Sequence, residues 1–294
     1  MQVGWLGLGA MGAPMAACLA GAGHDVAGYD VVPDRAQELA GAGVRPVRTI
    51  AAAVDGADVV AVMVATPEQL QRALFSPAGV APVLAAGTIV MIMATVGPEA
   101  VTAAAARLAG RGGRVIDAPV SGGVARAASG DLLVMVSGPE DSIARAQPLL
   151  GVLARSAPVV GSSPGDGQRM KLVNQLLCGV HIAAAAEALA FAESLGLDPA
   201  QCWQALRDGA AASFMFEDRG ARMISGQFGD VRSAMDIFVK DMGLVAGAAE
   251  EAGAPVPLAA AARQLYDRGH DQGLGRRDDS ALIEVFRHAR GAPG

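Results

Sequence analysis

The stretch Val3-Gly-Trp-Leu-Gly7-Leu-Gly9-Ala-Met-Gly12 decides the fold of the first half of the chain. Its opening residues, 3–6, are an apolar run that predicts a buried strand, and residues 11–22 predict a helix. The three glycines between them have the spacing of a dinucleotide-binding turn. The first allows a tight turn, the second lets the backbone approach a diphosphate, and the third lets the helix pack against the strand. The diphosphate would lie at the helix N-terminus, where free N–H groups and the helix dipole favour an anion.

The chain has 38 glycines in 294 residues, so this spacing is weak evidence by itself and its context must decide. The context is favourable because Asp30 ends the second predicted strand, Val26–Tyr29, about twenty residues further on. A carboxylate there accepts hydrogen bonds from the ribose hydroxyls and repels a 2′-phosphate. We therefore predict NAD as the cofactor, while Arg35 nearby leaves NADP open. The alternative is a glycine-rich turn followed by an ordinary loop aspartate.

Further apolar runs at residues 59–64, 89–93 and 115–116 are separated by Pro- or Gly-marked turns and by helical segments such as 33–42. Continuous apolarity predicts strands that are covered on both faces, hence a mostly parallel sheet between helices. We expect residues 132–136 and 158–160 to extend this sheet near its edge.

The pattern changes at Gly161-Ser-Ser-Pro-Gly-Asp-Gly167. A long helical pattern follows from about residue 168 to 195, and the remaining chain is predicted to be helical without a strand. The predicted fold class is α/β, with a Rossmann-like NAD-binding domain (residues 1–162) followed by an all-helical substrate and dimerisation domain (residues 163–294).

Composition excludes several classes of protein. Hydrophobic residues make up 52% of the chain and charged residues 18%, which excludes a disordered chain. The net charge of -6, without a run of Lys or Arg, argues against nucleic acid as a partner. The longest uninterrupted apolar runs, 59–65 and 89–96, are well short of the roughly 20 residues that span a membrane, and the N-terminus does not resemble a signal peptide. Three distant cysteines predict neither a disulfide framework nor a metal site, and we expect a cytoplasmic location.

A second motif, Asp117-Ala-Pro-Val-Ser121-Gly122-Gly123, follows a predicted strand. Successive small residues offer backbone N–H groups to an anion such as a substrate carboxylate, and Ser121 adds a hydroxyl donor. An ordinary tight turn explains the local pattern equally well.

The third feature is Lys171 on the long predicted helix, with Asn174, Gln175 and Cys178 three, four and seven residues further on, along one face. A lysine that is desolvated beside uncharged donors has a lowered pKa and can exchange a proton near neutral pH. A lone helix lysine is more often solvated. Lys240-Asp241, in a later helical stretch, is by itself typical of a surface charge pair, and the four histidines have no metal-ligand spacing.

Together these segments resemble the β-hydroxyacid dehydrogenase family, which includes 3-hydroxyisobutyrate dehydrogenase and tartronate semialdehyde reductase. The resemblance runs from residue 2 to about 287, with GLGAMGAPM (7–15), DAPVSGG (117–123), GDGQRMKLVNQLL (165–177) and IFVKDMGLV (237–245) in family order. It implies that Lys171 is the catalytic acid/base and that Ser121, Gly122 and Gly123 hold the substrate carboxylate. It also implies that Thr95 contacts the nicotinamide side of the cofactor, that Lys240 reaches the cofactor cleft, and that the helical domain forms a homodimer or homotetramer. The further predicted cofactor contacts are Leu8, Ala10, Met11, Val64 and Ala65.

Two departures from the family pattern concern the substrate. Asn174-Gln175 stands where the family usually has two asparagines, and Ala94-Thr95 where it usually has Ser-Thr. Gln175 and Asn174 are expected to orient the substrate hydroxyl or Lys171. The stretches 171–190, 213–219, 233–241 and 278–286 resemble the branch that contains L-threonate dehydrogenase, so a four-carbon sugar acid is the predicted substrate. The alternatives are 3-hydroxyisobutyrate or tartronate semialdehyde as substrate, an imine reductase-like enzyme, and a non-catalytic dinucleotide-binding module.

Overall fold

The computed structural model describes residues 1–291, and two compact units divide them after Lys171. The predicted boundary at residue 162 lies in the loop between strand β11 (Val159–Gly161) and helix α8 (Asp166–Ser194). The first two turns of α8 thus belong to the first unit and the rest of this helix to the second.

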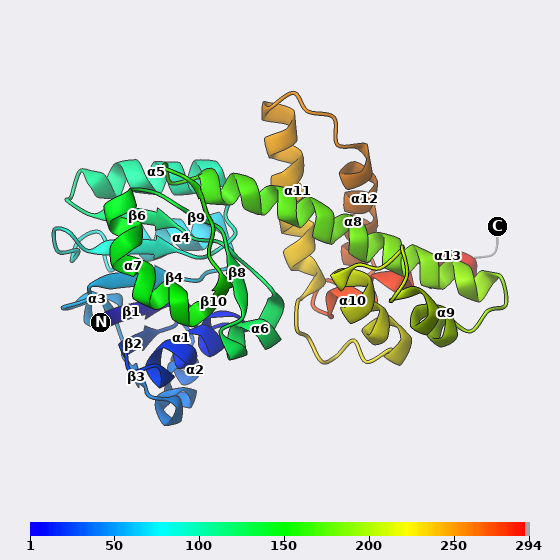
Figure 1. Cartoon of the computed structure of the whole chain (residues 1–294), viewed down its shortest axis with the longest axis horizontal. Coiled ribbons are helices and arrows are strands. Elements are labelled where there is room, and N and C mark those ends of the chain that lie inside the picture. The colour runs from blue at the N-terminus through cyan, green and yellow to red at the C-terminus, as the bar shows by residue number, and fades with distance from the viewer. Residues whose placement is uncertain (292–294) are drawn as a thin grey trace. The chain divides into compact units, whose positions relative to one another are not determined.

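The first unit is built on an eight-stranded sheet of order β11-β9-β6-β5-β4-β1-β2-β3 (Figure 1). The six strands from β3 to β6 are all parallel, and the chain runs β1-β2-β3 to one side and β4-β5-β6 to the other. This reversal of direction between β1 and β4 is the switch point at which doubly wound sheets bind ligands. The strands are β1 (Gln2–Leu6), β2 (Asp25–Tyr29), β3 (Val44–Pro46), β4 (Val59–Val62), β5 (Ile89–Ile92), β6 (Arg114–Asp117), β9 (Val136–Ser137) and β11.

Helices cover both faces of this sheet, as the continuous apolar runs predicted. Val59 and Ala61 of β4 belong to one buried cluster, whereas Val60 and Val62 belong to the cluster on the opposite face. The first cluster includes residues of α1 and α7, and the second includes residues of α4 and α5. The helices of this unit are α1 (Gly12–Gly21), α2 (Pro33–Glu38), α3 (Ile50–Val54), α4 (Pro67–Phe75), α5 (Pro98–Ala109), α6 (Gly123–Ser129) and α7 (Glu140–Leu153), with a 3-10 turn at Ala40–Ala42.

One edge of the sheet differs from the sequence prediction. Residues 132–136 were expected to extend the main sheet, but β8 (Leu132–Val134) lies between β7 (Val120–Ser121) and β10 (Ala154–Ser156) in a separate three-stranded sheet. Of residues 132–136, only Val136, in β9, belongs to the main sheet, where β9 pairs antiparallel with β6. The chain changes sheets at Met135, whose N–H donates to the carbonyl of Pro119. The prediction also missed β3, a three-residue strand that follows a positive-φ turn at Gly43.

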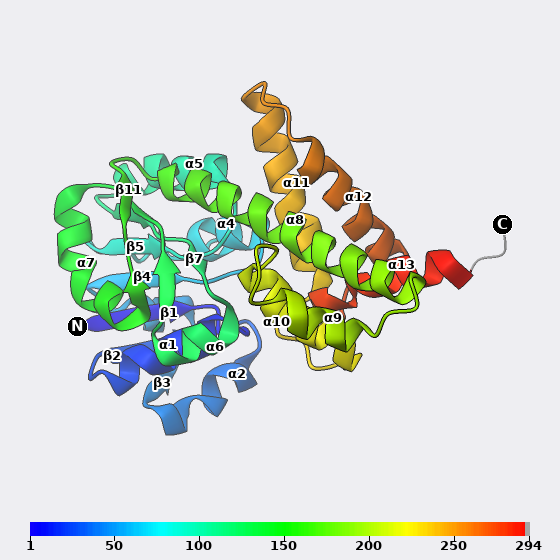
Figure 2. The same ribbon diagram turned by 45° about the vertical axis from the view of Figure 1, so that its right-hand side comes forward.

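The second unit consists of helices, in agreement with the prediction. Within residues 172–291 the sole β-type pairing is an isolated bridge between Ala234 and Asp278. Helices α11 and α12 run side by side in Figures 1 and 2, and Phe238 of α11 stacks on Tyr266 of α12 with 5.4 Å between ring centroids. The helices after α8 are α9 (Pro199–Leu206), α10 (Phe214–Ser225), α11 (Met235–Glu251), α12 (Pro257–Asp271) and α13 (Ile283–Gly291), with a 3-10 turn, η2, at Asp279–Leu282.

Helix α8 is long and apolar enough to cross a membrane, judged by length and composition alone. This helix was not expected from the uninterrupted apolar runs of the sequence, because polar residues interrupt its apolar stretch. About 56% of its most apolar window is buried within the protein. Ile182, Ala186 and Leu189 of α8 are at most 1% exposed and belong to the core of the second unit. This burial is what the core helix of a folded domain requires.

Candidate active site

The glycine loop connects β1 to α1, and two of its glycines are required by the fold itself. Gly7 has φ of +95°, and a Cβ atom there would lie 2.2 Å from the carbonyl oxygen of Met63 beside β4. A Cβ atom on Gly12 would lie 2.0 Å from the carbonyl oxygen of Gly7. That same carbonyl accepts a hydrogen bond of 3.0 Å from the indole of Trp5. A tight turn and a close helix–strand approach therefore need both glycines.

Gly9 differs, because a Cβ atom there would meet nothing within 4 Å. The protein's own packing therefore does not require a glycine at this position, and the space above it is open. Helix α1 begins three residues later without a side-chain cap. The N–H groups of Ala13 and Met15 donate to the carbonyls of Gly9 and Met11, and Pro14 has none, so an anion at this end would be attracted by the Gly12 N–H and the helix dipole. This loop fits the diphosphate of a dinucleotide, for which Gly9 allows close approach of the backbone.

Asp30 directly follows β2 and is only 6% exposed. Its carboxylate accepts hydrogen bonds from the backbone N–H groups of Leu8 (2.7 Å) and Val32 (2.8 Å), and the guanidinium of Arg35 lies 3.4 Å away. The bond to Leu8 ties the glycine loop to the end of the neighbouring strand. Asp30 is thus held in a fixed orientation at the carboxyl edge of the sheet.

The ends of β4 and β5 bring the other predicted cofactor contacts to the same edge. Val64 and Ala65 follow β4, and the Ala65 N–H donates to the side chain of Gln69 (2.8 Å). Thr95 follows β5 and is partly exposed between the buried residues Ala94 and Val96. Because the carboxyl ends of parallel strands share one edge of a sheet, these residues lie on the side that carries the glycine loop.

The predicted carboxylate site spans the end of β7 and the start of α6. Ser121 is the last residue of β7, and Gly122 and Gly123 have φ of +140° and +75°. A Cβ atom on Gly122 would lie 3.0–3.1 Å from Arg126 and Leu132, whereas one on Gly123 would meet nothing within 4 Å. Backbone geometry therefore explains both glycines, and the space at Gly123 is open.

Lys171 lies on the second turn of α8 and is 5% exposed. The alternative that it is an ordinary solvated helix lysine is therefore wrong. Lysine is almost never buried to this extent unless its ammonium group has partners or a function.

The first turn of α8 is fixed to the ends of β5 and β6 by two buried side chains, which stand in the motifs at 117–123 and 165–177 but had no role assigned to them from the sequence. Gln168 and Asp117 are both fully buried and share a hydrogen bond of 2.8 Å. Burial raises the pKa of the Asp117 carboxyl, although hydrogen bonds from Gln168, Gly165 and Ser137 act in the opposite direction. No signal in the sequence pointed to Gln168, because it stands among the polar residues Asp166 and Arg169 at the start of the helix.

In the second unit, Gln175 and Lys240 meet at Asp241. Gln175 is 6% exposed and donates to the Asp241 carboxylate at 2.5 Å, and its own amide oxygen accepts from Asn174 at 2.8 Å. The Lys240 ammonium lies 2.7 Å from the other Asp241 oxygen. Asp241 is 2% exposed, so Lys240-Asp241 is not the surface pair that its local sequence suggests. Lys171, Asn174 and Gln175 occupy consecutive turns of α8.

Residues 2–161 match the family model described as the NAD binding domain of 6-phosphogluconate dehydrogenase. Residues 165–286 match the model described as NAD-binding of NADP-dependent 3-hydroxyisobutyrate dehydrogenase. The chain belongs to the 3-hydroxyisobutyrate dehydrogenase family.

Relatives and solved structures of the 3-hydroxyisobutyrate dehydrogenase family align over nearly the whole chain. L-threonate dehydrogenase of Cupriavidus necator is 40% identical over 285 residues, which are 97% of this chain and 96% of that protein. 2-Hydroxy-3-oxopropionate reductase of Escherichia coli is 34% identical and covers 97% of each chain. A crystal structure of 3-hydroxyisobutyrate dehydrogenase from Salmonella typhimurium has a TM-score of 0.91 at 36% identity, covering 96% of this chain and 99% of that one.

Membership of the 3-hydroxyisobutyrate dehydrogenase family confirms the resemblance found in the sequence and the predicted fold class. It makes the protein an NAD(P)-dependent oxidoreductase that acts on the CH–OH group of a hydroxy acid. The geometry of the glycine loop agrees with this, because Gly7 and Gly12 build the turn while Gly9 leaves it open.

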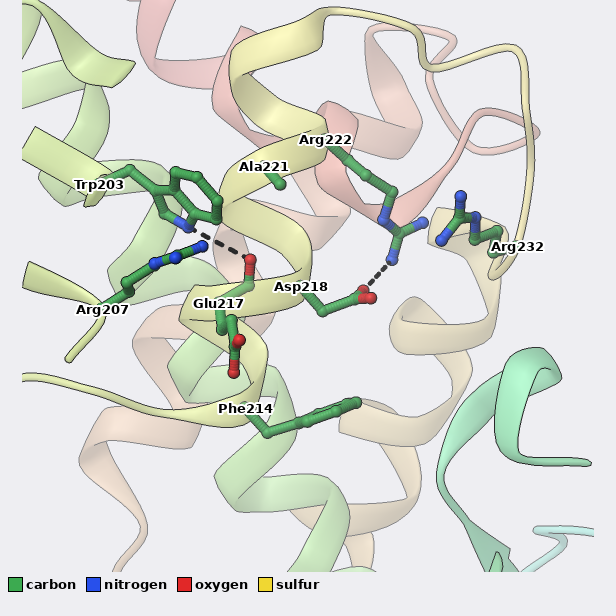
Figure 3. Close-up of a pocket in the computed structure, with 8 residues that line it drawn as sticks. All are labelled: Trp203, Arg207, Phe214, Glu217, Asp218, Ala221, Arg222 and Arg232. Carbon is green, nitrogen blue, oxygen red and sulfur yellow. Dashed lines mark hydrogen bonds and ion pairs between the residues drawn. The ribbon is translucent and has the colours of Figure 1, made fainter. Parts of the chain in front are cut away.

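A pocket of about 460 Å³ in the second unit contains none of the residues that the sequence predicted for the site (Figure 3). Figure 3 shows Arg222 directed at Asp218, with 2.9 Å between nitrogen and oxygen, and the Trp203 indole directed at the carbonyl of Glu217 at 3.2 Å. Arg222 and Asp218 thus serve as partners for each other, and nothing in this lining gives a reason to place the family's hydride-transfer chemistry there. The pocket is lined by Trp203, Arg207, Phe214, Glu217, Asp218, Ala221, Arg222 and Arg232.

Proposed function

We propose that this protein is an NAD-linked dehydrogenase of a four-carbon sugar acid such as L-threonate, with Lys171 as the proton-transfer residue. The observation that carries the proposal is the burial of Lys171 on a helix whose first turn is bonded to the ends of β5 and β6. The substrate class is supported by the relatives named L-threonate dehydrogenase, among them the one from C. necator.

In the proposed reaction, the substrate carboxylate binds to Ser121, Gly122 and Gly123, which orients the carbinol carbon. Bound NAD supplies the hydride acceptor. Lys171, in its neutral form, takes the hydroxyl proton as the substrate is oxidised to the keto acid. In the reverse direction its ammonium form returns that proton to the carbonyl oxygen. The protein therefore contributes placement and a proton path, and the cofactor contributes the redox chemistry.

Asn174 and Gln175 are proposed to orient the substrate hydroxyl or the Lys171 amine, and Lys240 to contact the cofactor. The fixed Gln175 amide supports an orienting role, because Asp241 and Asn174 hold both of its ends. Gln175 is longer than the asparagine usual in the family, which would change the hydrogen bonds that a substrate hydroxyl receives.

NAD, rather than NADP, is the proposed cofactor. Asp30 places a buried carboxylate where the adenosine ribose is expected, and it would repel a 2′-phosphate. The two residues after it, Val31 and Val32, are uncharged and 81% and 43% exposed, so they offer no cation to a phosphate. Arg35 already lies against Asp30 itself.

The second candidate function is reduction of 2-hydroxy-3-oxopropionate (tartronate semialdehyde), which the E. coli relative favours. Both functions would use the same lysine and carboxylate site, and they differ in the chain length of the acid and in the reacting carbon, which is C2 in the sugar acid and C3 in 2-hydroxy-3-oxopropionate. An imine reductase-like enzyme or a non-catalytic module would have no use for a buried lysine at position 171.

The experiment that tests the proposal is a spectrophotometric screen of NAD reduction. The panel contains L-threonate, D-threonate, the erythronates, D-glycerate, 3-hydroxyisobutyrate and L-serine. We expect kcat/KM to be highest for a four-carbon acid. Far higher activity on 3-hydroxyisobutyrate would contradict the substrate assignment, and NAD binding without activity on any hydroxy acid would favour a non-catalytic module.

We also propose that the protein is a cytoplasmic homo-oligomer, a dimer or tetramer, which associates through α8. The exposed apolar residues of α8 in the second unit include Val173, Leu177 and Phe191, and Leu195 directly follows the helix; these four residues are 49–61% exposed. Together with the exposed Ala184 and Ala188 they recur at intervals of four, seven, four, three and four residues. Such spacing forms one apolar stripe, here called the α8 stripe, of the kind that packs against another helix.

A further inference from the structure

The Gln168 side chain uses its entire hydrogen-bonding capacity inside the first unit. Its amide oxygen accepts from the backbone N–H groups of Val96 (2.9 Å) and Gly97 (3.1 Å). Its amide nitrogen donates to the carbonyl of Ala94 (3.0 Å) and to Asp117 (2.8 Å). A side-chain amide has two acceptor sites and two donor hydrogens, so all four are used. Gln168 is 0% exposed, and water does not substitute for any of these bonds.

These four bonds fix the segment after β5 from both sides. Ala94, Val96 and Gly97 are held by one amide group, and Thr95, the predicted nicotinamide contact, lies between them. A shift of the Gln168 amide would therefore shift the backbone on both sides of Thr95.

Asp117 holds the start of α8 at the same place. Its carboxylate accepts from the backbone N–H groups of Gly165 (3.0 Å) and Gln168 (2.9 Å). Ser137 donates to the same carboxylate at 3.4 Å and accepts from the Gly167 N–H at 2.9 Å. Because Lys171 follows Gln168 by three residues, its turn of the helix stacks directly on the anchored one.

We infer that Gln168 is a positioning residue for hydride transfer, which sets the Thr95 segment and the helical turn of Lys171 in register with each other. The buried Gln168 amide is bonded to the segment that carries Thr95, and Gln168 itself lies on the helical turn before Lys171. This inference rests on the proposed role of Lys171. In this positioning role, neither Gln168 nor Asp117 needs to contact the substrate or the cofactor.

The pattern of donors and acceptors explains why a glutamine occupies this position. The two N–H groups of Val96 and Gly97 require an acceptor, whereas the carbonyl of Ala94 and the carboxylate of Asp117 require a donor. An ionised glutamate would turn an acceptor oxygen toward both the Ala94 carbonyl and the Asp117 carboxylate. A methionine of similar length would leave the Val96 and Gly97 N–H groups and the Ala94 carbonyl without this partner, and the Asp117 carboxylate with one hydrogen bond fewer.

The first test compares Gln168→Met with the core variant Leu108→Ala, assayed with L-threonate and NAD. Leu108 is fully buried on α5, so its truncation lowers stability without removing a bond at the strand ends. We expect Gln168→Met to lower kcat per folded molecule about 100-fold, the cost of a misplaced reacting group, with KM changed less than about threefold. Leu108→Ala should keep kcat within about threefold of wild type. Equal kcat in Gln168→Met and Leu108→Ala would overturn the inference.

The second test uses Gln168→Glu and the pH profile of kcat. The introduced carboxyl would face Asp117, the titratable group bonded to this amide, and two buried carboxyls at this distance retain a shared proton. With that proton present, the new side chain donates to Asp117 as the amide does. We therefore expect the ratio of kcat in Gln168→Glu to kcat in wild type to rise as the pH is lowered from about 9 to 6. A ratio that stays flat contradicts the positioning role, because a merely structural role changes the folded fraction only.

The third test needs no turnover. We expect the amide hydrogens of residues 96 and 97 to exchange at least about tenfold faster in Gln168→Met, with the strand amides of Met91 and Ile92 unchanged. Unchanged protection at 96 and 97 would overturn the inference. Lys171→Met is assayed in parallel: if it turns over normally, the proposed acid/base role fails. If it is inactive while Gln168→Met turns over normally, only the role of Gln168 fails.

Discussion

Two charged residues of the candidate site are distinguished by their burial. Lys171 and Asp30 are 5% and 6% exposed, and each belongs to a residue type that is seldom buried without a purpose. For Asp30 the structure gives the partners: two backbone N–H groups hold its carboxylate in place. Under the proposed function, this fixed negative charge would discriminate between cofactors, because the 2′-phosphate of NADP carries the same sign.

Exchanging this charge should change the cofactor preference. In Asp30→Asn combined with Val31→Arg, the carboxylate is removed and a guanidinium is added at an 81% exposed position. We expect the ratio of kcat/KM with NADP to kcat/KM with NAD to rise on the order of 100-fold, as a charge-assisted hydrogen bond replaces a repulsion. Both cofactors are compared on one preparation, so a loss of folded protein cancels. Asp34→Ser, which removes an exposed carboxylate on α2, should leave the ratio unchanged, and an unchanged ratio in the double variant would disprove the assignment.

At the scale of elements, the sequence predicted the parallel strands and the helices that cover them, because their apolar runs are long enough to be read without tertiary information. It did not predict β3, or the change of sheets at Met135. The strand β3 and the change of sheets at Met135 each depend on strand pairings of two or three residues. Such short pairings are determined by the neighbouring strands in the folded protein and leave no pattern in the sequence.

The same limit applies to the candidate site. Glycine spacing and strand ends located the loop of Gly7, Gly9 and Gly12 and the carboxylate of Asp30. Gln168 and Asp117 could not be found in this way, because they act on backbone groups that lie 71 to 74 and 48 residues away along the chain. A sequence pattern records no such partners.

In the second unit, α10 is joined to the turn before α13 by buried ion pairs. Arg222 of α10 binds Asp278 and Asp218, and the Arg222 and Asp278 side chains are 12% and 1% exposed. Burial alone would raise the pKa of Asp278, but the hydrogen bond from Ser280 and the charge of Arg222 outweigh it and hold the pKa below its ordinary value. Burial likewise opposes, without overcoming, the lowering of the Asp218 pKa by Arg219 and Arg222.

Removing this arginine should therefore destabilise the protein in a pH-dependent way. We expect Arg222→Met to lower the free energy of unfolding by about 3 kcal/mol at pH 7, because it removes the cation that is paired with the buried Asp278 carboxylate and one of the two paired with Asp218. A carboxyl with a depressed folded pKa adds stability above its unfolded pKa of about 3.9 and loses it as the pH falls further. The difference between wild type and variant should accordingly shrink below about pH 4.

Denaturant titrations at pH 7 and pH 3.5 measure this difference. Arg207→Met serves as the control, since that guanidinium is 39% exposed and stacks on Trp203 at 4.7 Å from the ring centroid. It should cost less than about 1 kcal/mol. A difference for Arg222→Met that is the same at both pH values would contradict the electrostatic explanation.

At the scale of the whole molecule, α8 has two tasks. Its first two turns anchor Lys171 to the strand ends, and its remaining length provides core residues on one face and the α8 stripe on another. An apolar stripe of six exposed residues, five on α8 and Leu195 directly after it, is more than a monomer usually leaves in water.

A charge placed in the α8 stripe should weaken self-association. Phe191→Asp introduces a carboxylate at a 61% exposed position, so it costs the isolated chain little but would be buried in a helix–helix contact. We expect its dimer dissociation constant to rise at least about 100-fold in sedimentation analysis. Leu258→Asp, on α12 and 70% exposed, should leave it unchanged. If both variants keep the wild-type mass at all concentrations, association does not use the stripe.

The account as a whole depends on the Lys171 amine as the proton-transfer group. The most direct test is turnover by Lys171→Met, using the hydroxy acid that the wild-type protein oxidises fastest, together with its affinity for NADH. We predict that kcat falls by about 1000-fold or more, the upper part of the usual range for general acid–base catalysis. NADH affinity should stay within about threefold of wild type, because the amine is assigned to the substrate hydroxyl. Turnover within about tenfold of wild type would contradict the account.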